Sequence, residues 1–153
     1  MGEFGQPLAE FLGEGDLGKL LAAIADAGLR VSRRIASGPF GGDLSAIVGA
    51  NTGGESQKAL DIFADDTFAE ILRGAGVRGM ASEEREAPVQ LDSDGAFLVG
   101  LDPLDGSSNI ETNVTMGSIV AIFDAPARAG VEAADFLQKG HKQRAAALVL
   151  YGP

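Results

Sequence analysis

Residues 96–109 read AFLVGLDPLDGSSN, and this stretch decides how the rest of the chain is interpreted. Its first part, Ala96 to Leu101, is nearly all apolar, which is typical of a strand buried on both faces of a sheet. Asp102 therefore lies where a strand leaves the sheet, a common place for binding groups. A plain turn would also contain Asp, Pro and Gly, but eight such residues in this order after an apolar strand favour a functional loop.

The residue types in this loop suit a divalent cation and a phosphate group. Pro103 fixes one backbone torsion, so the turn is stiff and can place Asp102 and Asp105 on one side. With the Leu104 carbonyl they offer three oxygen ligands, as hard cations such as Mg²⁺ require. Gly106 lets the backbone approach a ligand, and the amides of residues 106–108 can form a nest for phosphate.

Two amphipathic helices are predicted before this loop. Residues 17–35 carry an apolar stripe at three-four spacing, with Asp16 as the expected N-cap and Gly38-Pro39 as the stop; the stripe is Leu17, Leu20, Leu21, Ile24, Gly28, Val31 and Ile35. A second helix is predicted from about Ser56 to Arg73, ending before Gly74; its shared face is Leu60, Phe63, Ala64, Thr67, Phe68, Ile71 and Leu72.

Strands are expected mainly in the second half of the chain. They are Val77–Ser82, Ala96–Leu101, Ser118–Phe123 and Gln143–Tyr151, with a loop at 130–139 that can include helix in Val131–Leu137. The Gly-rich residues 38–54 are interpreted as a loop with a short helical turn at Leu44–Val48. Helices first and strands later predict an α+β fold, with helices layered on a mixed β-sheet.

Composition excludes several classes of protein. The 153 residues suit one domain, 45% of them are hydrophobic, and the absence of cysteine excludes disulfides and thiolate chemistry. The net charge of −10 disfavours nucleic acid as a partner. No secretory leader is recognised and no apolar run is long enough to span a membrane, so a cytoplasmic protein is expected. The acidity indicates either simple solubility or carboxylates gathered around metal ions.

The loop resembles the signature of class I fructose-1,6-bisphosphatases across Leu101 to Ile110. The shorter Asp-Pro-hydrophobic-Asp-Gly-Ser/Thr pattern marks a wider superfamily that includes inositol monophosphatases, and residues 107–110 point to the bisphosphatase branch. Residues 54–61, 82–84 and 143–152 also resemble segments of that family. The resemblance implies a sugar phosphatase fold, with residues 1–153 forming the N-terminal half of an αβαβα sandwich that is truncated at its C-terminal end.

The resemblance also implies roles for individual residues. The family's metal ligands fall on Glu83, Glu84, Asp102, Asp105 and the carbonyl of Leu104. Catalytic roles fall on Glu55, Asp61 and Glu84, which would help to activate the attacking water. Contacts to the substrate phosphate fall on Asp105, Gly106, Ser107, Ser108 and Asn109.

Simpler explanations are open for some of these positions. Thr52 and Glu55 fit a helix capping box, and Glu83-Glu84 can be an exposed turn. Asp65 is four residues after Asp61 and is interpreted as part of a solvated face rather than a site. The single histidine, His141, is expected on the surface.

The function implied is metal-dependent hydrolysis of the 1-phosphate of fructose 1,6-bisphosphate, with Mg²⁺ as the expected cofactor and Mn²⁺ or Zn²⁺ as alternatives. After Asn109 the chain offers four scattered Lys or Arg residues, too few to hold a sugar bisphosphate, so the chain alone is expected to have weak or no activity. The resemblance implies a homo-oligomer, a tetramer or dimer. Open alternatives are an inositol-phosphate or sedoheptulose-bisphosphate phosphatase, and a non-catalytic metal-binding domain; a role in gluconeogenesis is not distinguished from one in carbon fixation.

Overall fold

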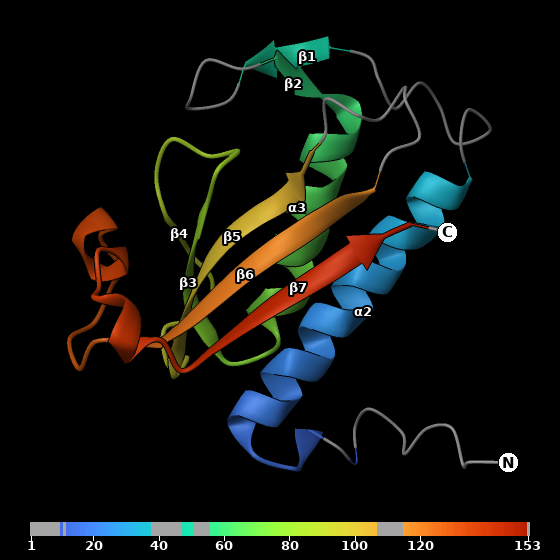
Figure 1. Ribbon diagram of the computed structural model, residues 1–153. Coiled ribbons are helices and arrows are strands. Elements are labelled where there is room, and N and C mark those ends of the chain that lie inside the picture. The colour runs from blue at the N-terminus through green and yellow to red at the C-terminus, as the bar shows by residue number, and fades with distance from the viewer. Residues whose placement is uncertain (1–9, 11, 38–46, 51–55, 107–114, 153) are drawn as a thin grey trace, which may run out of the picture.

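A computed structural model describes residues 10, 12–37, 47–50, 56–106 and 115–152. Two long helices, α2 (Asp16–Ala36) and α3 (Ala59–Arg73), pack against a twisted sheet of five strands (Figure 1). The architecture is therefore the predicted α+β arrangement of helices on a mixed sheet. Neither helix within the described ranges is long and apolar enough to cross a bilayer.

Helix α2 follows the predicted apolar stripe. Leu20, Ile24, Gly28 and Val31 are buried, because they recur on one face of the helix. Gly28 is required where the helix crosses the last strand, since a Cβ there would lie 2.8 Å from Cγ1 of Val149. The N-cap is Gly15 and not Asp16, which is the first helical residue and makes no side-chain cap.

Helix α3 is shorter than predicted. Its first turn begins at Ala59, because β2 (Ser56–Lys58) pairs with β1 (Ile47–Ala50) in an antiparallel ribbon. The helical turn predicted at Leu44–Val48 is therefore wrong for Ile47 and Val48, and its first three residues lie outside the described part of the chain. The predicted face is buried except for Ile71, which is partly buried, and Phe63, which lies at its edge beneath the guanidinium of Arg34.

The five-stranded sheet has the order β4-β3-β5-β6-β7. Its strands are β3 (Val77–Ser82), β4 (Val89–Gln90), β5 (Phe97–Asp105), β6 (Met116–Asp124) and β7 (Ala145–Tyr151). β3 and β5 are parallel neighbours, and every other pairing is antiparallel. The four predicted strands are confirmed, with β5 and β6 longer than expected and β7 starting two residues later than the predicted Gln143. The two-residue β4 was missed because it is too short to show a periodic pattern.

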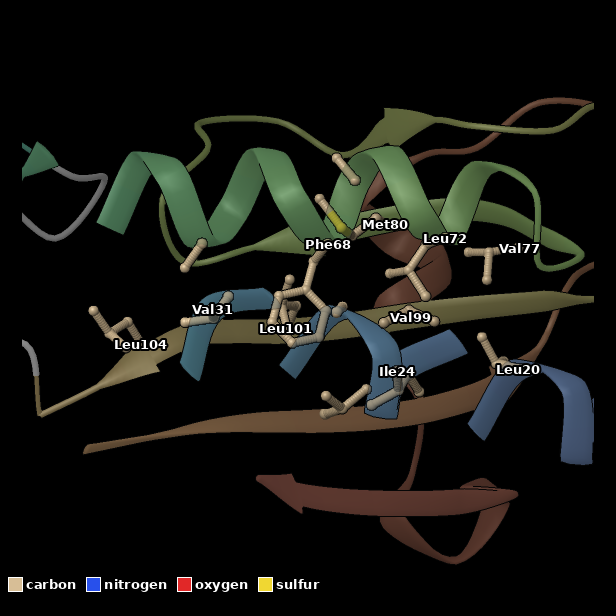
Figure 2. Close-up of a cluster of buried hydrophobic side chains, with 14 of the residues drawn as sticks. Leu20, Ile24, Val31, Phe68, Leu72, Val77, Met80, Val99, Leu101 and Leu104 are labelled. Carbon is tan, nitrogen blue, oxygen red and sulfur yellow. The ribbon is translucent and has the colours of Figure 1, made fainter. Parts of the chain in front are cut away.

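An apolar core of described residues fills the space between the helices and one face of the sheet (Figure 2). Phe68 and Leu72 of α3 face Val99 and Leu101 of β5, while Val31 approaches from α2. All five side chains are at most 6% exposed. Burial of this area supplies most of the stabilisation of the described part of the chain.

The connection between β6 and β7 contains two short 3₁₀ helices, Ala133–Phe136 and Gly140–Lys142. The first lies within the predicted Val131–Leu137 segment. Asp135 accepts hydrogen bonds from Arg128 and from the amide of Glu132, which fixes the bend. His141 is exposed, as predicted.

The far face of β6 and β7 carries exposed apolar side chains. Ile119, Leu148 and Leu150 are 45%, 63% and 65% exposed, because alternate residues of a strand point away from the helices. In the sheet order, β7 is an edge strand. Such a surface tends to pair with other chains.

The 153-residue chain is therefore expected to self-associate, and Leu148→Lys with Leu150→Lys should shift it toward monomer. Size-exclusion chromatography with light scattering measures the distribution. Leu29→Lys is a matched control, because Leu29 is 47% exposed on α2, away from this face. An unchanged distribution in the double variant would exclude this face as the contact.

Candidate metal centre

The parallel pairing of β3 and β5 brings two acidic segments together. Ser82 at the end of β3 is in register with Leu101 of β5, and the amide of Glu83 donates to the Leu101 carbonyl at 3.0 Å. The next residue of β5 is Asp102, so Glu83 and Asp102 follow neighbouring positions at one edge of the sheet. Residues far apart in the sequence meet because parallel strands end at the same edge.

The Asp102 carboxyl is half-buried beside Glu83. Burial, together with the negative charge of Glu83 and a hydrogen bond with it, raises the pKa of Asp102 from 3.8 to about 7. The amide of Leu104 opposes this shift by donating to Asp102 Oδ1 at 3.1 Å, and the charge of Asp105 adds a smaller upward effect. The neighbouring carboxylate thus disfavours the ionised form of Asp102.

A bulge follows Asp102 in the pairing of β5 with β6. Asp102 is opposite Ile119 and Asp105 is opposite Gly117, so Pro103 and Leu104 together face the single residue Ser118. The bulge turns the backbone between the two aspartates away from the regular ladder. Leu104 keeps its side chain in the core, and Asp105 is exposed.

A buried chain of hydroxyl groups supports the bulge. Ser118 Oγ donates to the Pro103 carbonyl at 2.7 Å and lies 2.5 Å from the Tyr151 hydroxyl. Since the Ser118 proton is used on Pro103, Tyr151 is the donor to Ser118. Burial raises the pKa of Tyr151, so the phenol remains a neutral donor. The Pro103 carbonyl thus has a partner that the irregular ladder does not supply.

Gly106 directly follows β5 and has a φ of +82°, in the left-handed region. A side chain is strained in this conformation, so glycine is required to turn the chain here. The expectation that residue 106 lets the backbone come close to a ligand stays a prediction. Ser107, Ser108 and Asn109 lie outside the described residues, as does Glu55.

Helix α3 places two further carboxylates under the sheet. Asp61 and Asp65 are 1% and 3% exposed. The interpretation of Asp65 as part of a solvated face is therefore wrong. It belongs to the buried stripe because it lies three residues before Phe68, one helical turn. Its Oδ2 accepts a hydrogen bond from Arg85 Nε at 2.5 Å.

The donor chemistry fits a hard divalent cation. Oxygen ligands are present and Asp102 is hindered from ionising, a condition that a nearby cation removes. Within the described ranges, however, no three Asp, Glu or His side chains are close enough to hold one ion together. The structure joins Glu83 with Asp102 and places Asp105 nearby. Glu84 is the next residue of the turn after Glu83, and Asp61 is buried on α3. A bound cation would have to draw additional oxygens toward the pair.

Comparison with known proteins decides the family. Residues 3–153 match the protein family described as "Fructose-1-6-bisphosphatase, N-terminal domain". The chain belongs to the fructose-1,6-bisphosphatase family. A class 1 fructose-1,6-bisphosphatase of Paracoccus denitrificans is 50% identical over 133 residues, which cover 87% of this chain and 38% of the relative. One from Xanthobacter autotrophicus is 44% identical and covers 95% and 41%.

Solved bisphosphatase structures have the same fold. Leishmania major fructose-1,6-bisphosphatase in its holo form superposes with a TM-score of 0.86 at 30% identity, covering 96% of this chain and 49% of that one. A Toxoplasma gondii structure described as a sedoheptulose-1,7 bisphosphatase gives a TM-score of 0.79 at 29% identity, covering 97% and 48%. The chain thus spans about half the length of these bisphosphatase structures and two fifths of the curated relatives.

The shifted pKa of Asp102 predicts a pH dependence of stability in metal-free protein. The pKa is raised in the folded state, so this group's contribution is fully present below pH 3.8 and is lost as the pH rises through about 7. After discounting for solvent screening, the effect is of order 1 kcal/mol, or about 2–4 °C in Tm. Thermal unfolding in chelator at pH 5 and pH 8 measures it. Asp102→Asn should remove this part of the pH dependence, and parallel profiles for the two proteins would contradict the assignment.

Proposed function

We propose that this chain contributes the metal-binding half of a fructose-1,6-bisphosphatase, which hydrolyses the 1-phosphate of fructose 1,6-bisphosphate. The observation that carries the proposal is the contact of half-buried Asp102 with exposed Glu83 at the ends of two parallel strands. Holding a half-buried carboxyl group against a second carboxyl group costs stability, and perturbed pairs of this kind cluster at functional sites. Family membership supplies the reaction to which this use belongs.

The residues proposed to hold divalent metal are Glu83, Glu84, Asp102, Asp105 and the Leu104 carbonyl. When bound, the metal would polarise the phosphoryl oxygens and lower the pKa of a coordinated water. The chain's own residues do the rest. Hydrogen bonding from the Leu104 amide orients Asp102, and the hydroxyl chain from Tyr151 holds the Pro103 carbonyl behind the loop.

Proton transfer and phosphate orientation are assigned to other residues. Glu84 and Asp61, with Glu55, are proposed to accept the proton of the attacking water. Asp105 and the backbone of residues 106–109 are proposed to orient the phosphoryl group, an assignment that the left-handed turn at Gly106 supports. Asp61 is 1% exposed on α3.

Magnesium is proposed as the physiological ion, with Mn²⁺ and Zn²⁺ as alternatives, because all the assigned ligands are oxygens. Millimolar Mg²⁺ is expected to raise the Tm of the chain at pH 7.5. At one hundred times the dissociation constant the stabilisation is about 2.7 kcal/mol, or several degrees. Differential scanning calorimetry with Mg²⁺ and with equal ionic strength of K⁺ measures the shift. Equal Tm values in the two salts would count against an assembled site.

The assay that tests the function compares two proteins. A full-length form, with the length of the curated relatives, is expected to release phosphate from fructose 1,6-bisphosphate with Mg²⁺. The 153-residue chain alone is expected to show little or no turnover, because it spans only about two fifths of the length of the curated relatives. Inactivity of the full-length form toward all sugar bisphosphates would overturn the proposal.

Sedoheptulose 1,7-bisphosphate is the second candidate substrate, favoured by the likeness to the Toxoplasma gondii structure. The two sugars differ in chain length, so kcat/KM for both, with inositol monophosphate as a third substrate, separates the possibilities. We further propose that the full-length protein is a cytoplasmic homo-oligomer. Analytical ultracentrifugation of that form tests the assembly.

A further inference from the structure

The acidic turn at residues 82–85, which contains Glu83 and Glu84, is held by hydrogen bonds at both of its ends. Ser82 to Arg85 form a tight turn in which the Arg85 amide donates to the Ser82 carbonyl at 3.2 Å. The Glu84 amide lies 3.3 Å from Ser82 Oγ. Glu83 and Glu84 are the two middle residues, so any movement of the turn moves both carboxylates.

The side chain of Arg85 ties this turn to helix α3. Its Nε donates to Asp65 Oδ2 at 2.5 Å, and one terminal nitrogen donates to Asp66 Oδ1 at 2.9 Å. The guanidinium group presents its donors in a fixed plane, so a contact to two successive helix residues fixes orientation as well as distance. The Asp65 side chain is 5% exposed and that of Asp66 is 69% exposed, so only the first contact is shielded from water.

Asp65 has little other compensation for its charge. Its second oxygen, Oδ1, is buried and has no hydrogen-bond partner among the described residues. A buried carboxylate that depends on one cation is a strong constraint on where that cation lies. Asp65 also follows Asp61 by four residues, so the two lie one turn apart on the same side of α3.

We propose that the Asp65–Arg85 ion pair is a positioning device for metal binding, which sets the height of the Glu83-Glu84 turn above Asp61. The inference rests on the proposed function, since it concerns the same site. The turn is fixed to β5 by the Glu83 amide and to α3 by Arg85, and Asp102 meets Glu83 only while both attachments hold. Positioning groups behind metal ligands are commonly worth 10–100-fold in affinity.

The test is titration of Mn²⁺ into the 153-residue chain, followed by isothermal calorimetry. Asp65→Asn and Arg85→Met are expected to weaken Mn²⁺ binding about tenfold. Arg85→Lys keeps the charge but loses the planar fork, so an intermediate loss is expected. Asp66→Asn is the matched control, since it removes the exposed contact to the same arginine and should change the affinity less than twofold.

A core variant distinguishes the positioning role of the ion pair from a general effect on stability. Val31→Ala in α2 destabilises the chain away from the turn, and its Mn²⁺ affinity at 10 °C should equal that of wild type. Equal Mn²⁺ affinity in Asp65→Asn, Arg85→Met and wild type would overturn the positioning role. If Asp102→Asn still abolishes Mn²⁺ binding in that case, the proposed function stands. A tenfold loss of Mn²⁺ affinity in Val31→Ala, equal to the loss in Asp65→Asn, would also overturn the positioning role. Failure of the wild type to bind Mn²⁺ would overturn both proposals.

Discussion

Asp102→Asn is expected to lower phosphate release from fructose 1,6-bisphosphate by about 10²–10³-fold in a full-length form, the scale of losing one charged group that stabilises a transition state. Asparagine has nearly the same shape and can still accept the hydrogen bond from the Leu104 amide. It cannot supply a negatively charged ligand, so the fold should persist while metal binding is lost. Steady-state kinetics across a series of Mg²⁺ concentrations measures the change.

Asp92→Asn provides a control for this substitution. Asp92 Oδ1 accepts a hydrogen bond from the amide of Asp94 at 3.0 Å, the same i to i+2 contact that Asp102 makes with Leu104. It precedes β5, whereas Asp102 lies near the end of that strand. The activity of the Asp92→Asn protein should stay within twofold of wild type. An Asp102→Asn protein that keeps more than a third of wild-type activity would remove Asp102 from the metal site.

Phe68→Ala is expected to reduce the free energy of unfolding by about 3–5 kcal/mol, the usual cost of removing a buried aromatic side chain. Phe68 is 0% exposed and points from α3 into the space shared with α2 and β5 (Figure 2). The cavity would lie at the meeting point of all three elements, so it cannot be filled by a shift of one. Urea denaturation followed by circular dichroism measures the loss.

Phe63 offers a comparison within the same helix. It is 36% exposed and contacts the Arg34 guanidinium, so Phe63→Ala should cost about 1 kcal/mol or less. Similar losses for the two variants would contradict the burial assigned to Phe68. A loss below 1 kcal/mol for Phe68→Ala would show that the core does not depend on this contact.

The sequence could predict the elements whose pattern repeats. The stripe of α2 and the apolar run of β5 are periodic or continuous, so burial followed from spacing alone. The N-cap was displaced by one residue because Gly15 and Asp16 are both acceptable there and local chemistry does not choose. β2 was missed because its three residues are too few to show a period of two and they run directly into the helical pattern of α3.

The candidate site was only partly accessible to the same reasoning. The proximity of Glu83 and Asp102 could be anticipated from the resemblance but not from spacing, because it depends on β3 and β5 being parallel neighbours. Asp65 was misinterpreted because a charged residue was assumed to face water. Its spacing of three from Phe68 and seven from Leu72 places it on the buried stripe, a signal that was present in the sequence. Its partner, Arg85, is twenty residues away and could not be found locally.

The most direct test of the account is a crystal structure of the protein grown with Mn²⁺, with anomalous scattering used to locate the ion. The account predicts a peak about 2.0–2.3 Å from carboxylate oxygens of both Glu83 and Asp102. A peak elsewhere in the protein, or none while the two carboxyl groups remain hydrogen-bonded to each other, would contradict it.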